Sequence, residues 1–138
     1  MTAFEIVDHT ADIGIRAFGR TEAEVFQNAA TGMFSLIADL ENVVETSDFL
    51  IEVEAEDRET LLVAWLNELL YLYDSNDMLL KRFELAELGE TSLKGRAFGE
   101  PMDSKRHRLK TDIKAATYHM LRLTEESGRW QAEVIFDV

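Results

Sequence analysis

The chain has 138 residues, a formal net charge of −13 and no cysteine. This length is typical of one domain, spanning 1–138, and a hydrophobic fraction of 46% can supply a buried core. The lack of cysteine excludes disulfide scaffolds, thiolate zinc sites and cysteine nucleophiles. No apolar run reaches the roughly 18 residues of a membrane span, and no secretory signal is recognisable, so we expect a cytoplasmic protein without membrane contact.

The charge is unevenly distributed along the chain. Residues 96–114 include six basic and three acidic side chains, a net charge of +3, which leaves −16 for the rest. The strong negative charge of the chain outside this segment argues against direct binding of nucleic acid. It favours a basic protein partner or a metal cation. The basic segment is either a solvated loop or a contact surface.

The first third of the chain predicts two strands and a helix. Residues 4–7 and 13–18 have strand-like patterns, separated by a polar turn at 8–12. A helix is expected from Thr21 to about Asp39, because Thr21 and Glu24 form a capping-box pattern before an apolar stripe at helical spacing. Residues 14–21 nearly match a phosphate-binding loop, but Arg20 stands where that loop needs lysine, and a strand, a turn and a capped helix explain the pattern.

The remaining patterns predict a second helix and two hairpins. Residues 49–55 alternate as a strand with one solvated face, and a largely buried helix should follow from Asp57 to about Tyr73. Strands are expected at 80–88 and 91–98, and at 118–124 and 130–136, whereas 113–118 is ambiguous between a helical turn and a strand. We therefore expect a single α+β domain with two main helices packed on a mostly antiparallel or mixed β-sheet.

Candidate functional groups are few. The three histidines have no metal-ligand spacing, and His107 and His119 are explained most simply as hydrogen-bonded framework residues. Asp137 and the α-carboxylate of Val138 lie close together after a strand, and a third oxygen ligand such as Asp12 would complete a site for Ca²⁺ or Mg²⁺. The alternative is a frayed, solvated chain end.

Four parts of the chain together resemble the archease family. They extend in order from Asp8 to the last residue, which makes the combination more specific than any single part. They are DHTADIGI at 8–15, WLNELL at 65–70, GEPMD at 99–103 with His107 and IKAATYH at 113–119, and WQAEVIFDV at 130–138.

The resemblance implies a function and a metal site. Archeases are small acidic α+β proteins that activate the GTP-dependent RNA ligase of tRNA splicing and RNA repair, stimulating its guanylylation and turnover without catalysing ligation themselves. Members bind a divalent cation, and the matching residues here are Asp12, Asp137 and Val138. Calcium is the expected ion, with Mg²⁺ or Mn²⁺ as alternatives, because hard-oxygen ligands suit all three.

Further residues and two other functions remain open. Asp8, His9, His107, Lys114 and His119 are candidates for partner contact or for support of the site, and RNA would be reached only through the ligase. One alternative is a chaperone-like modulator of tRNA-modifying enzymes such as a tRNA methyltransferase, which predicts an exposed apolar patch near the helix of Trp65. The other is a metal-dependent hydrolase at the same site, which would need a general base that no pattern reveals.

Overall fold

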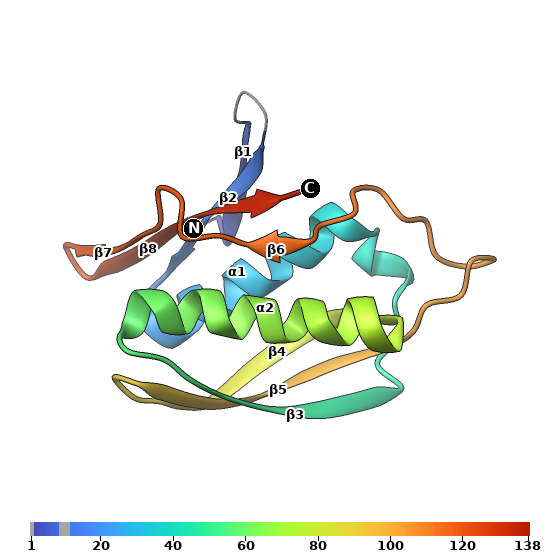
Figure 1. Ribbon diagram of the computed structural model, residues 1–138, viewed down its shortest axis with the longest axis horizontal. Helices are drawn as coiled ribbons and strands as arrows, with labels where there is room; N and C mark the ends of the chain where they lie inside the picture. The colour runs from blue at the N-terminus through green and yellow to red at the C-terminus, as the bar shows by residue number, and fades with distance from the viewer. Residues whose placement is uncertain (1, 9–11) are drawn as a thin grey trace.

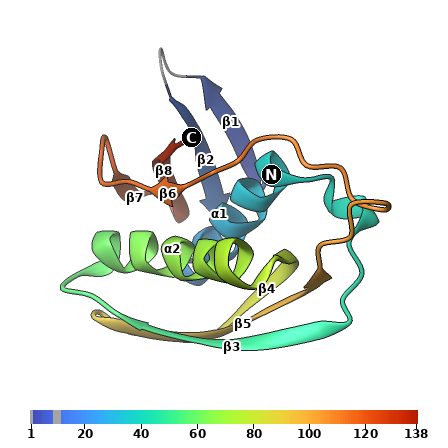
Figure 2. The same cartoon turned by 45° about the vertical axis from the view of Figure 1, so that its right-hand side comes forward.

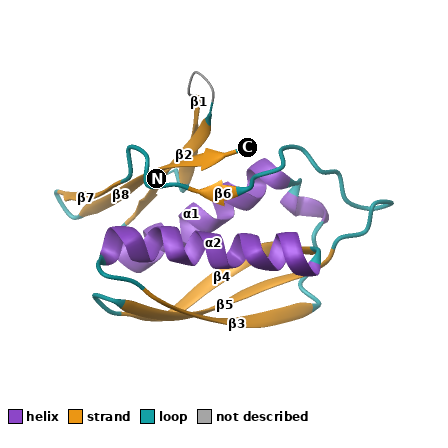
Figure 3. Ribbon diagram, in the orientation of Figure 1, coloured by secondary structure: helices purple, strands orange, loops and turns teal. Residues whose placement is uncertain are grey.

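The computed structural model describes residues 2–8 and 12–138. Two α-helices, eight strands and one short 3₁₀ helix make up the described chain, and a long loop links the fifth and sixth strands (Figure 3). The elements are β1 (Phe4–Asp8), β2 (Ile13–Gly19), α1 (Glu22–Ile37), η1 (Leu40–Asn42), β3 (Ser47–Glu54), α2 (Arg58–Asn76), β4 (Met78–Leu88), β5 (Ser92–Pro101), β6 (Ala115–Ala116), β7 (Arg122–Glu126) and β8 (Arg129–Asp137).

The two helices lie between two antiparallel sheets (Figures 1 and 2). One sheet has the strand order β1-β2-β8-β6, with β7 also pairing with β8, and the other has the order β3-β5-β4. Helix α1 contacts β2 in the first sheet and β4 in the second, while α2 contacts β6 and β3. The α+β prediction is confirmed, with two sheets enclosing the helices where the sequence suggested one.

The five-stranded sheet joins the two ends of the chain. Strand β8 lies inside this sheet and pairs with β2 from Ile13 opposite Phe136 to Gly19 opposite Trp130. Gly14 is required at this crossing, because a Cβ atom there would lie 2.6 Å from the carbonyl oxygen of Val134. The missing side chain lets the two strands approach closely, and Ile135 fills the space beside it.

Side-chain caps fix the start of each helix. The hydroxyl of Thr21 accepts a hydrogen bond from the Glu24 N–H at 3.1 Å, while the Glu24 carboxylate accepts from the N–H of Arg20, one residue before the expected capping-box partner. Helix α2 has a complete capping box between Asp57 and Thr60. Both predicted helix starts are confirmed, and α2 extends three residues beyond the expected end.

Trp65 is at the centre of the core and is fully buried. Its Nε1–H donates to the carbonyl oxygen of Phe26 at 2.9 Å, and its ring packs edge-on against Phe83. Trp65 thus ties the two helices together and contributes nothing to an exposed apolar patch, whereas Tyr71 of the same helix is 59% exposed.

The strand predicted at 118–124 begins later than expected. A four-residue turn occupies 118–121, closed by a hydrogen bond from the Leu121 N–H to the Tyr118 carbonyl oxygen at 3.2 Å. Met120 has a φ of 53° in this turn, which is incompatible with a strand, so β7 starts only at Arg122. The ambiguous segment before it contains the two-residue strand β6.

Replacing Met120 by glycine is expected to stabilise the protein by about 0.5–1 kcal/mol. The left-handed backbone conformation is unfavourable for a residue with a Cβ atom. The half-exposed Met120 side chain contributes little packing energy to offset this. Urea unfolding of the parent, Met120→Gly and Met120→Ala measures the effect. The alanine variant should show no gain, since it retains the Cβ atom, and a glycine variant less stable than the parent would contradict the explanation.

Candidate metal and partner site

The predicted metal ligands gather at one end of the five-stranded sheet. Ile13 pairs with Phe136, so the residues one step further along, Asp12 and Asp137, flank the same end of the β2–β8 ladder. Directly opposed residues on neighbouring strands share a face of a sheet. If this register continued by one residue, Asp12 would lie opposite Asp137, with Val138 next in the chain.

Main-chain hydrogen bonds hold the end of β8 in place. Ala115 of β6 pairs with Asp137, and the Lys114 N–H donates to the Asp137 carbonyl oxygen at 2.9 Å. Thr117 adds two hydrogen bonds to the Ile135 carbonyl oxygen, from its N–H at 3.0 Å and its hydroxyl at 2.8 Å. The last residues are thus fixed between two neighbouring segments, unlike a frayed chain end.

The carboxylates of Asp12 and Asp137 have no partner among the described residues. Asp12 is half-buried and Asp137 is exposed, and within residues 2–8 and 12–138 neither carboxylate takes part in a hydrogen bond or ion pair. The same described residues contain no cluster of three or more His, Asp or Glu side chains that could hold a metal ion. A site at this position would consequently use the two carboxylates together with a main-chain or terminal oxygen of Val138.

Three of the other candidate residues, Asp8, Lys114 and His119, are exposed. Asp8 pairs with Ile13 at the exposed end of β1, and the Lys114 side chain is exposed beside Asp137. His119 is exposed in the turn before β7, where its N–H bonds to the Thr117 hydroxyl at 3.3 Å. His9 lies outside the described residues.

His107 is a buried framework residue. Its ring Nδ1 accepts a hydrogen bond from the Asp103 N–H at 2.8 Å, so the hydrogen is on Nε2, which donates to Glu100 at 2.9 Å. Its side chain has no exposed surface, which rules out direct contact with a partner. The framework interpretation of this histidine is confirmed.

Glu100 is a buried charged residue of the other sheet that sequence reasoning missed. Its buried carboxylate accepts hydrogen bonds from Arg106, from His107 and from the N–H of Val44 at 2.7 Å. The Arg106 guanidinium and the other two donors lower the pKa of Glu100 to about 2, outweighing the opposing effect of burial. The cluster fastens the long loop after β5 to the segment before β3.

The basic segment 96–114 is partly neutralised by ion pairs. Arg96 forms an ion pair with Asp48 at 2.6 Å, and Lys110 lies 3.5 Å from Asp39. Arg106 pairs with Glu100 and Asp103, which belong to the same segment. Two of the six basic side chains thus attach this segment to the acidic body.

Comparison with known proteins identifies the family to which the chain belongs. The model of the archease protein family (MTH1598/TM1083) matches residues 4–138. The archease of Methanosarcina mazei is 40% identical, with 98% of this chain and 95% of the relative covered, and that of Sulfolobus acidocaldarius is 37% identical with complete coverage of both. The chain belongs to the archease family.

Solved structures support the same fold. The solution structure of protein 1598 from Methanobacterium thermoautotrophicum matches with a TM-score of 0.85 and 37% identity, covering both chains completely. A crystal structure from Thermotoga maritima, described as an archease and possible chaperone, matches with a TM-score of 0.63 over 96% of this chain and 94% of that one. Its identity of 22% supports the shared fold alone. In the described part of this chain, neither helix is long and apolar enough to cross a membrane.

Proposed function

We propose that this archease activates a GTP-dependent RNA ligase through the end of the β2–β8 ladder. The observation that carries the proposal is the pair of uncommitted carboxylates, Asp12 and Asp137, on strands held by main-chain hydrogen bonds. A carboxylate pair that has no partner within residues 2–8 and 12–138 is available to a metal ion or a partner. The activity itself comes from the resemblance to archeases, and this geometry is compatible with it.

The donor set fits a hard divalent cation. Two carboxylates and a main-chain or terminal oxygen of Val138 are ligands that Ca²⁺ prefers, and Mg²⁺ and Mn²⁺ accept them as well. These three ligands fill only part of the coordination sphere of Ca²⁺, so water or partner oxygens would complete it. A cation bound there would offset the repulsion between the carboxylates and provide coordination positions for oxygen atoms of the partner.

The residues of this chain would act by presentation rather than by chemistry. Ala115 and Lys114 hold the main chain of Asp137, and Gly14 keeps β2 close to β8, so the two carboxylates reach the ligase in a fixed arrangement. The ligase binds RNA and therefore has a basic surface, which the net charge of −13 would attract. RNA itself would contact the ligase only.

A guanylylation assay tests the proposal. Purified cognate ligase is incubated with labelled GTP and divalent cation, with and without this protein, and the covalent ligase–GMP adduct is measured over time. We expect an increase in the initial rate of at least tenfold and multiple turnovers of RNA joining. Unchanged guanylylation at saturating protein would refute ligase activation.

Metal binding is tested separately by calorimetric titration of the metal-free protein with Ca²⁺, Mg²⁺ and Mn²⁺. We expect one Ca²⁺ to bind the parent protein, and binding to be lost in Asp12→Asn. An Asp12→Asn variant that binds calcium as the parent does would place the ion elsewhere. Ligase stimulation without any metal binding would separate the activator function from the cation.

A chaperone-like modulator of tRNA-modifying enzymes such as a tRNA methyltransferase remains the second candidate. The description of the Thermotoga maritima structure as a possible chaperone favours it. The burial of Trp65 removes one contributor to the apolar patch that this function predicts, whereas Tyr71 of the same helix is exposed. Recovery of several unrelated RNA-modifying enzymes with the tagged protein, and no ligase, would support the chaperone function instead.

A further inference from the structure

The sheet on the far side of the helices has an open edge. Strand β3 pairs with β5 on one side only. The Ala55 N–H bonds to the Thr91 carbonyl oxygen at 2.9 Å, and hydrogen-bonded positions alternate along an antiparallel pair. The odd-numbered residues of β3 therefore bond to β5, while the main-chain groups of the even-numbered residues 48–54 point to the open edge. No hydrogen bond within the described residues uses those edge groups.

The same even-numbered residues give this edge its charge. Their side chains point away from the helices, whereas Ile51 is buried beneath them. Asp48 is neutralised by Arg96 at 2.6 Å. Glu52 and Glu54 are exposed and, within the described chain, form no ion pair closer than 4.0 Å.

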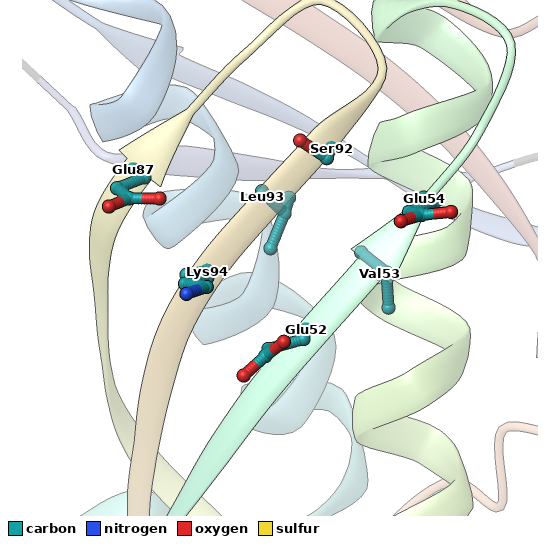
Figure 4. Close-up of a pocket in the computed structure, with 7 residues that line it drawn as sticks. All are labelled: Glu52, Val53, Glu54, Glu87, Ser92, Leu93 and Lys94. Carbon is teal, nitrogen blue, oxygen red and sulfur yellow. The ribbon is translucent and has the colours of Figure 1, made fainter.

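A shallow hollow extends from this edge onto the outer face of the sheet (Figure 4). Glu52, Glu54 and Glu87 line it with Ser92 and Lys94, while Val53 and Leu93 point to the opposite side. Lys94 is opposite Glu52 on β3 and opposite Glu87 on β4. One lysine is therefore shared among three glutamates, and the hollow has a net charge of −2.

An apolar contact point adjoins the acidic hollow. Leu50 lies two residues before Glu52 on the same face and is 57% exposed. A neighbouring hollow is lined by Leu50 and Ala86 together with Glu84, Lys94 and Arg96, and Arg96 is paired with Asp48. The outer face of β3 thus carries one exposed leucine followed by two glutamates without ion pairs in the described chain, at the two-residue spacing of a strand.

We propose that the β3 edge binds an extended basic segment of a protein partner, which adds to the sheet as a fourth strand. The partner's main chain would bond to the free groups of residues 48–54, as in β-strand addition. Lysine or arginine at alternate positions would face Glu52 and Glu54, and an apolar residue would cover Leu50. This surface is on the opposite sheet from Asp12 and Asp137, so the proposal goes beyond the proposed function and does not rest on it.

The charges select this occupant over two others. A second copy of the chain would bring the glutamates of two β3 edges together, which like-charge repulsion disfavours. A nucleic acid would be repelled by the same carboxylates. A basic extended peptide satisfies both the main-chain groups and the unbalanced charge.

The probe is a synthetic peptide of sequence Lys-Thr-Lys-Thr-Val-Thr, in which two lysines and one valine at alternate positions share the face that would lie against Glu54, Glu52 and Leu50. We expect it to bind the full-length protein with amide NMR shifts concentrated at residues 48–54, and to slow amide hydrogen exchange at Leu50 and Glu52. A peptide of the same sequence, N-methylated at alternate residues, keeps the charge but loses the edge hydrogen bonds. Its affinity should fall at least tenfold.

Charge variants provide the matched control. Glu52→Lys with Glu54→Lys should weaken peptide binding at least tenfold, whereas Glu41→Lys with Glu59→Lys makes the same charge change at other exposed positions and should have a much smaller effect. Equal binding of the methylated peptide, equal loss in both variant pairs, or shifts centred away from β3 would each overturn the proposal. Dimerisation of the parent through β3, detected by sedimentation and the same amide shifts, would assign the edge to a second copy and would also overturn it.

Discussion

Asp137→Ala is expected to abolish stimulation of ligase guanylylation, with a loss of at least tenfold, while the protein folds as the parent does. The exposed carboxylate forms no hydrogen bond or ion pair within the described chain, so its removal should change the free energy of unfolding by less than about 0.5 kcal/mol. The main-chain bonds to Lys114 and Ala115 do not depend on that side chain. Rates measured at saturating protein, together with thermal unfolding, separate function from stability.

Two further variants make this prediction specific. Glu126→Ala removes a negative charge at the other end of the β7–β8 hairpin and should leave stimulation unchanged. Removal of Val138 tests the contribution of the chain end and should reduce stimulation as Asp137→Ala does. Full stimulation by Asp137→Ala would refute the role of these carboxylates, even if the protein as a whole activates the ligase.

Glu100→Gln should destabilise the protein by about 2–4 kcal/mol at neutral pH. A glutamine offers one acceptor oxygen and an NH₂ group where three donors converge. At least one of the buried donors, the Val44 N–H or the His107 Nε2–H, would then face another donor. Chemical unfolding of the parent and the variant measures the difference.

The pH dependence of that difference identifies its cause. The pKa of Glu100 is lowered to about 2 from a usual value of 4.5, so the folded state favours the ionised carboxylate. Its contribution is complete above about pH 4.5 and is lost as the pH falls toward 2. The difference in the free energy of unfolding between the parent and Glu100→Gln should therefore become smaller as the pH falls over this range. The exposed control Glu41→Gln should have nearly the same free energy of unfolding as the parent at any pH. A gap that is constant with pH would exclude ionisation of Glu100 as the source.

The same cluster is connected to the candidate metal site through the chain. Beyond His107, the N–H groups of Lys110 and Thr111 bond to the carbonyl oxygens of Ile37 and Leu36 at the end of α1. The chain then reaches β6 and the end of β8. Loss of the hydrogen bonds to Glu100 is consequently expected to make the chain from His107 to β6 more mobile. The far end of this segment positions Asp137.

The helices and most strands were predictable because local chemistry determines them. Thr21 and Asp57 cap their helices through their own side chains, and residues 49–55 alternate between the core and solvent. The segment 118–124 misled the prediction because its composition suits a strand. The turn there depends on the left-handed backbone of Met120, for which methionine gives no sequence signal.

The residues of the candidate metal site stay a prediction, and the contacts of the loop after β5 were not predictable. The resemblance to archeases pointed to Asp12 and Asp137, and the β2–β8 register brings them to one end of the sheet. The interaction of Glu100 with His107 was not foreseen, because Glu100 is at the end of β5, beyond the predicted strand 91–98, and has the parity of its solvent-exposed residues. Only the fold of the loop after β5 brings Arg106 and His107 over this carboxylate and buries it.

The internal position of β8 has a consequence for the order in which the protein forms. Strands β3, β4 and β5 and both helices are complete by residue 101, and the pairing of β3 with β5 joins residues 47–54 to residues 92–99. The β2–β8 ladder joins residues 13–19 to residues 130–136, so it cannot form before the β8 segment has been synthesised. Asp12 and Asp137 come together only at that step. A chain truncated before Asp137 would therefore fail to present both carboxylates to the partner.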